Sequence, residues 1–406
     1  IQIFDIMPLN ILIISQNQFP TNRPILNSLW NIEFVNRGNK VTWLMSSRTL
    51  TSCIVKSKWL KSDIFLVPKI SVGKNRLIDF FTDIWTKFKV YKFISKQSEI
   101  DIVHFHDTSF HNLIGFYAKF IDSRKLSLGY TAPFIDMKKA LADKSKGVDF
   151  FLRKVWYFLF RVIYMLSFST FDYIFPISNS LGKRIKTSYF INESKIMTVS
   201  ESASKKFLDF DRTEANHNSK LKIVYAGSMR NTRKLDFLLD SFNMVLREIP
   251  EVELDMIGWS EFDEDVISLK SYSNKLGIGH KVNFLGKQSY ENMPHLIGKC
   301  SVGVSPIPPE KYFLEATPTK VIEYLSLGIP VVSNKEIYDQ DRIVTESNGG
   351  ISVKYKRSSF SKAIIRLIKN PASAKQMGLK GKSWIIKNRT FERTAELIEA
   401  KFKSSL

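Results

Sequence analysis

The sequence is poor in cysteine and histidine. Its 406 residues include two cysteines, Cys53 and Cys300, and six histidines. The cysteines lie far apart without a CxxC pattern, and the histidines form no HExxH pattern, which argues against a disulfide framework and the common zinc sites. So few cysteines are typical of a protein from a reducing compartment.

Long apolar runs are also missing. The most aromatic segment, residues 150–175, is interrupted by Arg153, Lys154 and Arg161. Only ten uncharged residues then remain before Asp172, whereas a transmembrane helix needs about 20 largely apolar residues. The first residues lead into an apolar strand with no basic stretch ahead of it, so we expect no signal peptide. We therefore expect a cytoplasmic protein.

Acidic residues are few compared with basic ones. The chain has 39 Asp and Glu against 60 Lys and Arg, for a formal net charge of +21. Residues 1–200 hold 28 basic and 14 acidic residues, and the remainder holds 32 and 25. A basic surface attracts phosphate groups, which can belong to nucleic acid, anionic lipid or a charged substrate. Composition leaves these three partners open.

Two aromatic segments lie in the more basic half. In Lys74–Lys96, an aromatic stripe at helical spacing runs beside four lysines; the stripe is Ile78, Phe81, Trp85 and Phe88, and the lysines are Lys87, Lys89, Lys92 and Lys96. The second segment, Phe150–Phe175, contains eleven aromatic residues. Basic residues beside an aromatic stripe suit a helix lying on an anionic membrane surface. The alternative is that both segments are core helices with solvated lysines.

The order of apolar runs predicts an α/β fold. Buried strands are expected at 9–15 and 40–45 with a helix between them, which is a βαβ unit of a parallel sheet. The alternation continues through "IDIVHFHD" and "FDYIFPIS", stops in the polar stretch 200–220, and restarts at "LKIVYAGS". We interpret the polar stretch as a linker and predict two Rossmann-like domains, at 1–205 and 215–380.

The sequence "EATPTKVIE" places Glu315 and Glu323 around the start of a predicted helix. Thr317 is a good N-cap before a proline, and Gly328 ends the helix. Free backbone N–H groups and the helix dipole favour a phosphate at the N-terminus. Lys320 lies in the first turn, where a cation is unfavourable unless an anion sits between it and the helix. An anion flanked by two carboxylates that accept hydroxyl hydrogen bonds suits a nucleotide sugar.

These residues carry a specific resemblance. The pattern E-x7-E in "EATPTKVIE" is similar to the motif of the retaining glycosyltransferases of family four, which have the GT-B fold of two Rossmann-like domains. "LKIVYAGSMRNTRKLDFLLDSF", "VELDMIGWSE" and "LGIGHKVNFLGKQSYENMPHLIGKCSVGVSPIP" resemble the donor domain of that family in order and spacing. The resemblance covers residues 221–390 strongly and the first 200 residues thinly. It implies that the final helix, within 381–406, packs back on the first domain.

The resemblance implies roles for single residues of the donor side. Glu323 matches the glutamate expected on the ribose, and Glu315 matches the one near the donor sugar and its leaving phosphate. The family usually has G-R-x4-K after the first donor-domain strand. Here Gly227 matches, Ser228 stands in place of the arginine, and Arg233 stands in place of the lysine. The predicted catalytic residues are Glu315 and Arg233, and the predicted donor-binding residues are Glu323, Lys320, Thr319, Gly227, Ser228 and Arg230, with Arg230 or Lys320 replacing the missing cation.

The implied reaction is transfer of a sugar from a nucleotide-sugar to a hydroxyl acceptor with retention of configuration. We expect a lipid-linked acceptor or a growing surface glycan, with His106 and Asp107 on the acceptor side, and an enzyme peripheral on the inner face of the cell membrane. The nucleotide-sugar is a co-substrate, and no metal or other cofactor is expected.

Three alternatives compete with this hypothesis. The first is a sugar-nucleotide epimerase of the same fold. The second is a basic nucleic-acid-binding protein, for which no RNP or helix-turn-helix motif is present. The third is a catalytically inactive scaffold on the membrane surface. Ser228, which stands in place of the arginine of the family, leaves this alternative open. We expect no nucleic-acid partner.

Overall fold

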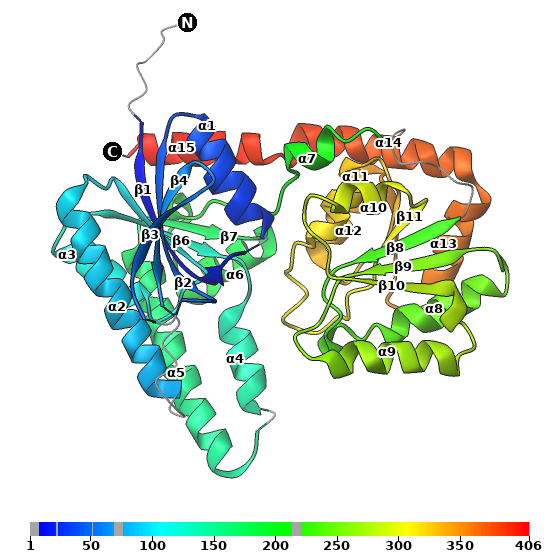
Figure 1. The fold of residues 1–406 in the computed structure, drawn as a ribbon, viewed down its shortest axis with the longest axis horizontal. Coiled ribbons are helices and arrows are strands. Elements are labelled where there is room, and N and C mark those ends of the chain that lie inside the picture. Colours follow the sequence, from blue (N-terminus) through cyan, green and yellow to red (C-terminus); the bar gives the residue numbers. More distant parts are fainter. Residues whose placement is uncertain are drawn as a thin grey trace, which may run out of the picture. The chain divides into compact units, whose positions relative to one another are not determined.

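The computed structural model of the protein describes residues 8–21, 23–50, 52–68, 76–143, 145–212 and 221–405. The chain divides into two compact units (Figure 1). Unit 1 comprises Ile1–Ser200 together with Phe391–Leu406, and unit 2 comprises Glu201–Thr390. Each unit has its own sheet and its own core, so each is described by itself.

Unit 1 is built on a seven-stranded sheet with the strand order β3-β4-β2-β1-β5-β6-β7. Its strands are β1 (Asn10–Phe19), β2 (Lys40–Ser47), β3 (Val55–Trp59), β4 (Ser62–Val67), β5 (Ile102–His106), β6 (Lys125–Tyr130) and β7 (Tyr173–Pro176). All neighbouring strands are parallel except β3 and β4, which form an antiparallel hairpin at one edge. The predicted parallel sheet is therefore present, and the sequence did not predict the hairpin.

Helices cover both faces of this sheet. They are η1 (Ile25–Glu33), α1 (Phe34–Asn36), α2 (Arg76–Gln97), α3 (Asn112–Phe120), α4 (Phe134–Asp143), α5 (Gly147–Thr170), α6 (Asn179–Tyr189), η2 (Glu193–Lys195) and α15 (Phe391–Lys403). The last helix, α15, buries Phe391 and Phe402 in the core of unit 1, and Glu399 on it forms an ion pair with Arg37. The carboxyl end of the chain thus completes the first unit.

Unit 2 has a six-stranded, wholly parallel sheet with the order β10-β9-β8-β11-β12-β13. The strands are β8 (Lys222–Ala226), β9 (Glu253–Ile257), β10 (Val282–Gly286), β11 (Val302–Ser305), β12 (Val331–Asn334) and β13 (Gly350–Val353). The helices are α7 (Lys205–Leu208), η4 (Asn231–Arg233), α8 (Asp236–Leu246), α9 (Asp263–Lys275), η5 (Gly279–Lys281), α10 (Met293–Gly298), α11 (Thr319–Ser326), α12 (Tyr338–Ser347), α13 (Arg357–Lys369) and α14 (Pro371–Asn388). Because parallel strands end at the same edge of a sheet, the segments after β8, β9 and β11 meet there.

Glycine allows two of these segments to approach closely. Gly227 follows β8 and Gly258 follows β9, and both have positive φ angles, of 152° and 143°. A Cβ atom on Gly258 would lie 1.8 Å from the backbone oxygen of Gly227. Only glycine fits at Gly258, and the contact brings the backbones at the carboxyl edge of the sheet together.

The predicted linker is partly folded. Unit 2 begins at Glu201, because Ala203 and Phe207 are buried in a core cluster of unit 2. A few apolar residues in a polar sequence anchor this segment, and they form too short a run to show periodicity. Residues 213–220 of the predicted linker lie outside the described residues.

Both aromatic segments of unit 1 form helices, α2 and α5. One expectation about α2 is wrong: Lys87 is 1% exposed and cannot face a lipid surface. Its Nζ lies 3.0 Å from Asp83 Oδ2 and 3.4 Å from His111 Nε2, so it belongs to a buried polar cluster. The side chain of Ile78 lies outside the described residues. Within the parts of the chain that the structure describes, no helix is long and apolar enough to span a membrane.

Candidate functional site

The first candidate site surrounds the N-terminus of α11 in unit 2. The helix begins at Thr319 after Pro318, and no side chain caps it. The prediction that Thr317 is the N-cap is wrong, because its hydroxyl instead donates to Asp339 Oδ2 at 2.7 Å. The N-cap residue, Pro318, thus offers no side-chain cap, and the Val321 N–H donates to the Pro318 carbonyl at 3.1 Å. The N-terminus of this helix is suited to binding an anion.

Lys320 lies in this first turn, close to the loop after β8. Its Nζ is 5.1 Å from the centre of the Tyr225 ring. A Cβ atom added to Gly227 would lie 3.3 Å from Lys320 Nζ. Burial, and then the charge of Arg233, lower the pKa of Lys320 to about 7, while Glu323 opposes the shift. Lys320, Arg233 and the N-terminus of α11 thus lie close to the loop after β8 that contains Gly227. Such a grouping of positive charge is what binding of a diphosphate requires.

Glu323 lies one turn further along α11. Burial, and then the charge of Glu201, raise its pKa to about 7, while Lys320 opposes the shift. The carboxyl group is held in a site that disfavours charge, which is common for functional groups. Glu201 was not predicted as part of this site; it precedes the first strand of unit 2, which begins at Lys222, by 21 positions, and no motif marks it.

The other predicted cations differ in their surroundings. Arg233 ends η4, and its guanidinium lies 4.5 Å from the centre of the Phe313 ring. Arg230 is 3.8 Å from Glu261 Oε2 and 5.9 Å from the centre of the Phe262 ring. Arg233 therefore acts on Lys320 electrostatically, whereas Arg230 pairs with a carboxylate of the loop after β9.

The remaining predicted donor-side residues shape the same edge. The Ser228 carbonyl accepts a hydrogen bond from the Tyr225 hydroxyl at 2.8 Å, and its own hydroxyl accepts one from Arg230 N at 3.3 Å. Ser228 thus fixes the loop and contributes no charge. Glu315 is half-buried in the segment between β11 and α11. This segment is tied to α12 by the Tyr338 N–H, which donates to the Leu314 carbonyl at 3.0 Å.

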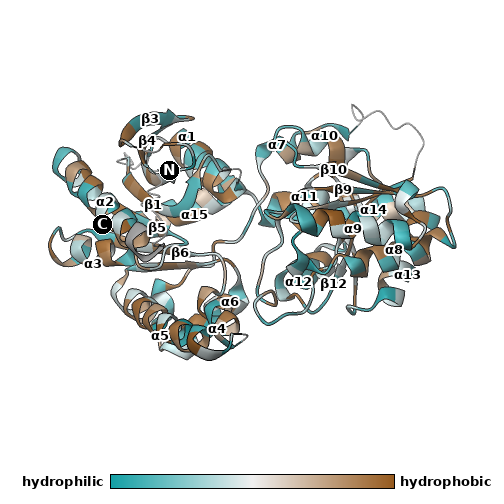
Figure 2. Cartoon of the chain, turned by 60° about the horizontal axis from the view of Figure 1, so that its bottom comes forward, coloured by the Kyte–Doolittle hydropathy of each residue, from teal (hydrophilic) through white to brown (hydrophobic). Residues whose placement is uncertain are grey.

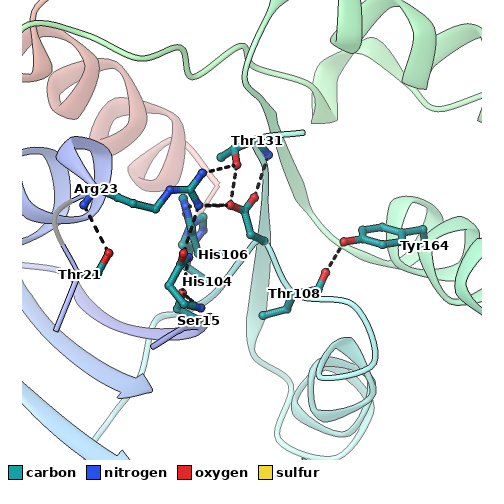
Figure 3. A network of polar contacts seen from close by, with 10 residues as sticks. Ser15, Thr21, Arg23, His104, His106, Thr108, Thr131 and Tyr164 are labelled. Atoms are coloured by element: carbon teal, nitrogen blue, oxygen red, sulfur yellow. Dashed lines mark hydrogen bonds and ion pairs between the residues drawn. The ribbon is translucent and has the colours of Figure 1, made fainter. Parts of the chain in front are cut away.

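The second candidate site lies in unit 1 at the carboxyl ends of β5 and β6. Asp107 follows β5 and accepts hydrogen bonds from the backbone N–H and the hydroxyl of Thr131, at 2.9 and 2.5 Å. Its Oδ2 also lies 2.5 Å from Arg23 Nη1 (Figure 3). Burial alone would raise the pKa of Asp107, but His106, Arg23 and Thr131 hold it below its usual range. Arg23 was not predicted, although it is the basic residue of the polar loop after the first strand.

His106 is buried rather than open to a ligand. It is 1% exposed. Its Nδ1 lies 3.4 Å from His104 Nε2, and its Nε2 lies 3.7 Å from Asp107 Oδ2 (Figure 3). Burial lowers its pKa to about 4, against the opposing charge of Asp107, so the imidazole is neutral at pH 7. His106 thus contacts Asp107 from the buried side.

Asp107 borders a cavity of about 620 Å³. The cavity lies entirely within unit 1. It is lined by residues from β1, the loop after it, α2, the loop after β5, the loop after β6, α4 and α5: Gln16, Asn17, Arg23, Phe80, Asp107, Ser109, Phe110, Ala132, Phe134, Met137, Lys138, Leu141, Trp156, Phe160 and Tyr164. His106 is not among them. Of the two predicted acceptor-side residues, Asp107 is therefore the one that reaches a space large enough for a ligand.

Within the described ranges, no three His, Cys, Asp or Glu side chains are grouped to hold a metal ion. The charged groups around α11 consist of cations near its first turn and carboxylates at Glu201 and Glu323. This arrangement can bind an anion and accept hydroxyl hydrogen bonds without further groups.

Known proteins resemble this chain in sequence and in fold. Residues 208–384 match the sequence model of the family described as glycosyl transferases group 1. The matched residues make up most of unit 2. No curated protein matches the sequence.

Many solved structures share the fold over nearly the whole chain. Sucrose-phosphate synthase from Thermosynechococcus elongatus has a TM-score of 0.75 at 12% identity and covers 97% of this chain and 98% of its own. HepE from Anabaena in complex with UDP-glucose has a TM-score of 0.69 at 13% identity and covers 98% and 100%. WaaG, a glycosyltransferase involved in lipopolysaccharide biosynthesis, has a TM-score of 0.69 at 10% identity and covers 96% and 98%. The predicted GT-B fold is confirmed, and the family match with these folds supports a glycosyltransferase.

Proposed function

We propose that this protein transfers a sugar from a nucleotide-sugar, held by unit 2, to a hydroxyl group of an acceptor held by unit 1. The observation that carries the proposal is the convergence of Lys320, Arg233 and the N-terminus of α11 beside the Gly227 loop. Such a site neutralises a diphosphate. The complex of the similarly folded HepE with UDP-glucose supports a uridine diphosphate sugar as the donor.

Each charged residue then has a role in the transfer. Glu323 accepts hydrogen bonds from the ribose hydroxyls, and Glu315 lies near the donor sugar and its leaving phosphate. As the bond between the anomeric carbon and the phosphate oxygen breaks, negative charge grows on the diphosphate, and Arg233 and Lys320 stabilise it. The acceptor oxygen forms its bond on the same face of the sugar, and its proton passes to the departing phosphate oxygen. This order retains the configuration at the anomeric carbon and involves no metal.

The acceptor is proposed to be lipid-linked or part of a surface glycan, at a membrane. On α5, apolar side chains at helical spacing are exposed: Val148, Phe151, Leu152, Val155, Phe158, Leu159, Met165 and Leu166. On α2, Phe81, Trp85 and Phe93 are exposed, with Lys89, Lys92 and Lys96 on the same helix. An isolated soluble unit rarely exposes so many large apolar side chains, and basic residues beside them suit an anionic bilayer.

A comparison of donors tests the proposed function. The melting temperature is measured with UDP-, GDP- and ADP-glucose for the wild type and for Lys320→Met. A ligand at 100 times its Kd stabilises the folded state by about 2.7 kcal/mol, so we expect a clear upward shift with UDP-glucose that Lys320→Met reduces. Release of UDP in the presence of a hydroxyl acceptor then reports transfer. No shift with any of the donors would contradict the proposal.

A further inference from the structure

The cavity of unit 1 has a polar end and an apolar end. At the polar end, Arg23 lies 2.5 Å from Asp107 and donates to Asn17 Oδ1 at 3.4 Å. Gln16 lines the same end. A carboxylate and two amides are groups that accept and donate hydrogen bonds to the hydroxyls of a sugar. This end therefore suits a hydroxyl-rich head group.

The apolar end is a cage of aromatic rings contributed by three separate segments. Phe80 of α2 lies 5.1 Å from Phe110 and 6.2 Å from Trp156 of α5, measured between ring centres. Phe110 in turn lies 5.5 Å from Trp156 and 6.2 Å from Phe160. Aromatic rings in edge contact hold one another in place. The cage is thus a preformed apolar space and not a set of loose surface side chains.

The apolar end continues onto the surface. Met137 and Leu141 of α4 line the cavity, yet they are 38% and 50% exposed. Next to them, α5 packs against α4 and exposes Phe151 and Leu152. In Figure 2, hydrophobic segments mark both helices. An apolar chain could pass from the cage over this rim without losing apolar contact.

The charged residues at the rim of the cavity also favour a mouth that faces a membrane. Lys138 of α4 lines the cavity, and its Nζ lies 5.5 Å from the centre of the Phe160 ring. Lys139 follows it and is also exposed. Lysines around an apolar opening attract an anionic bilayer. The cavity mouth would therefore face the lipid when the helices contact a membrane.

We propose that this cavity binds the first part of the hydrocarbon chain of an amphipathic acceptor. The hydroxyl-bearing head of the acceptor lies at Asp107, the chain runs through the cage of Phe80, Phe110, Trp156 and Phe160, and it leaves over Met137 and Leu141. The inference rests on the proposed function, in which unit 1 holds a hydroxyl acceptor. It adds that the enzyme recognises the chain itself, so that a soluble sugar alone is a poor acceptor.

The test uses an alkyl glucoside whose chain carries bromine, below its micelle-forming concentration, and methyl glucoside as the probe without a chain. Bromine quenches tryptophan fluorescence on contact, so the titration reports where the chain lies. We expect saturable quenching in the wild type, loss of most of it in Trp156→Phe, and no saturable binding of methyl glucoside over the same concentrations. Retained quenching in Trp156→Phe would overturn the proposal, as would equal affinity for the two glucosides.

Two further variants separate the cavity from the exposed surface. Ala132→Leu places a larger side chain in the cavity lining and should weaken binding of the alkyl glucoside by about tenfold or more. Phe158→Ser removes an exposed ring of α5 and should leave that binding unchanged. The reverse pattern would place the chain on the surface of α5 and overturn the proposal. Calorimetry measures the affinity of the same variants for UDP-glucose, which unit 2 is proposed to bind. A loss of donor binding can therefore be distinguished from a loss of chain binding.

Discussion

Lys320 and Glu323 lie one turn apart at the start of α11, both are half-buried, and both have a pKa of about 7. Each shift has burial as its largest cause, and each residue opposes the shift of the other. Near neutral pH, small changes in proton concentration therefore change the charge of both groups. Their proposed roles require opposite protonation states, which makes donor binding depend on pH in a defined way.

We predict that the affinity for UDP-glucose is greatest near pH 7. Above this pH Lys320 loses its proton and no longer attracts the diphosphate, whose charge is constant across the range. Below it Glu323 gains a proton and accepts ribose hydroxyls less well. Isothermal titration calorimetry from pH 5.5 to 8.5 checks this. Lys320→Met should flatten the alkaline side and Glu323→Gln the acidic side; an affinity independent of pH in the wild type would contradict the assignment.

Arg233→Ala should reduce turnover more than it reduces donor affinity. The charge on the diphosphate grows as the glycosidic phosphate bond breaks, so a cation placed there stabilises the transition state more than the bound substrate. We expect a loss of about 10²–10³-fold in kcat with a smaller change in the Kd of the donor. Arg366→Ala is the matched control, because Arg366 is an exposed arginine in the last turn of α13. Equal losses in the two variants would show that Arg233 has no special role.

Gly258→Ala should destabilise unit 2. The new Cβ atom would meet the backbone oxygen of Gly227, and the φ angle of 143° is strained for any L side chain. Overpacking costs about 1–3 kcal/mol and backbone strain about 1–3 kcal/mol more. Gly277→Ala is the control, since Gly277 has a φ angle of 74° but no atom within 4 Å of its added Cβ. Urea denaturation should separate the two variants, and equal stabilities would refute the close contact.

Membrane binding should depend on the exposed lysines of α2. Changing Lys89, Lys92 and Lys96 to Glu should release the protein from anionic vesicles at low salt, because each lysine near such a surface contributes about 1 kcal/mol. The control reverses the same number of charges in unit 2, at the exposed Lys362, Lys375 and Lys380. Vesicle sedimentation measures both. If the wild type remains in the supernatant at low salt, or if the control is also released, the membrane assignment to α2 is wrong.

The sequence predicted the sheets well and the surroundings of single side chains poorly. Continuous apolar runs mark the parallel strands, because both faces of such strands are buried. The hairpin of β3 and β4 was not predicted, because β3 lies at an edge of the sheet and its middle consists of three successive exposed polar residues, Lys56, Ser57 and Lys58. Helical spacing placed Lys87 beside an aromatic stripe, but it could not reveal that Asp83 and His111 provide a buried partner for its charge.

The sequence indicated candidate residues for the proposed donor side for a related reason. Glu323, Lys320 and Gly227 lie within short motifs whose order along the chain reflects the order of strands. Glu201 and Arg23 belong to segments without a motif, and the fold brings them to their sites through contacts distant in sequence. The pairing of Arg23 with Asp107 spans 84 positions, which no local pattern can show. The positions of these two charged residues could therefore be found only from the structure.

The most direct test of the account is the affinity of Glu323→Gln for UDP-glucose, measured by isothermal titration calorimetry at pH 7. A hydrogen bond to a charged acceptor contributes roughly 1–3 kcal/mol, so the account predicts weaker binding by that amount with little change in melting temperature. Glu251→Gln, an exposed residue just before β9 at the opposite end of the sheet, should bind as the wild type does. Unchanged affinity in Glu323→Gln would contradict the assignment of the nucleotide-sugar to the N-terminus of α11.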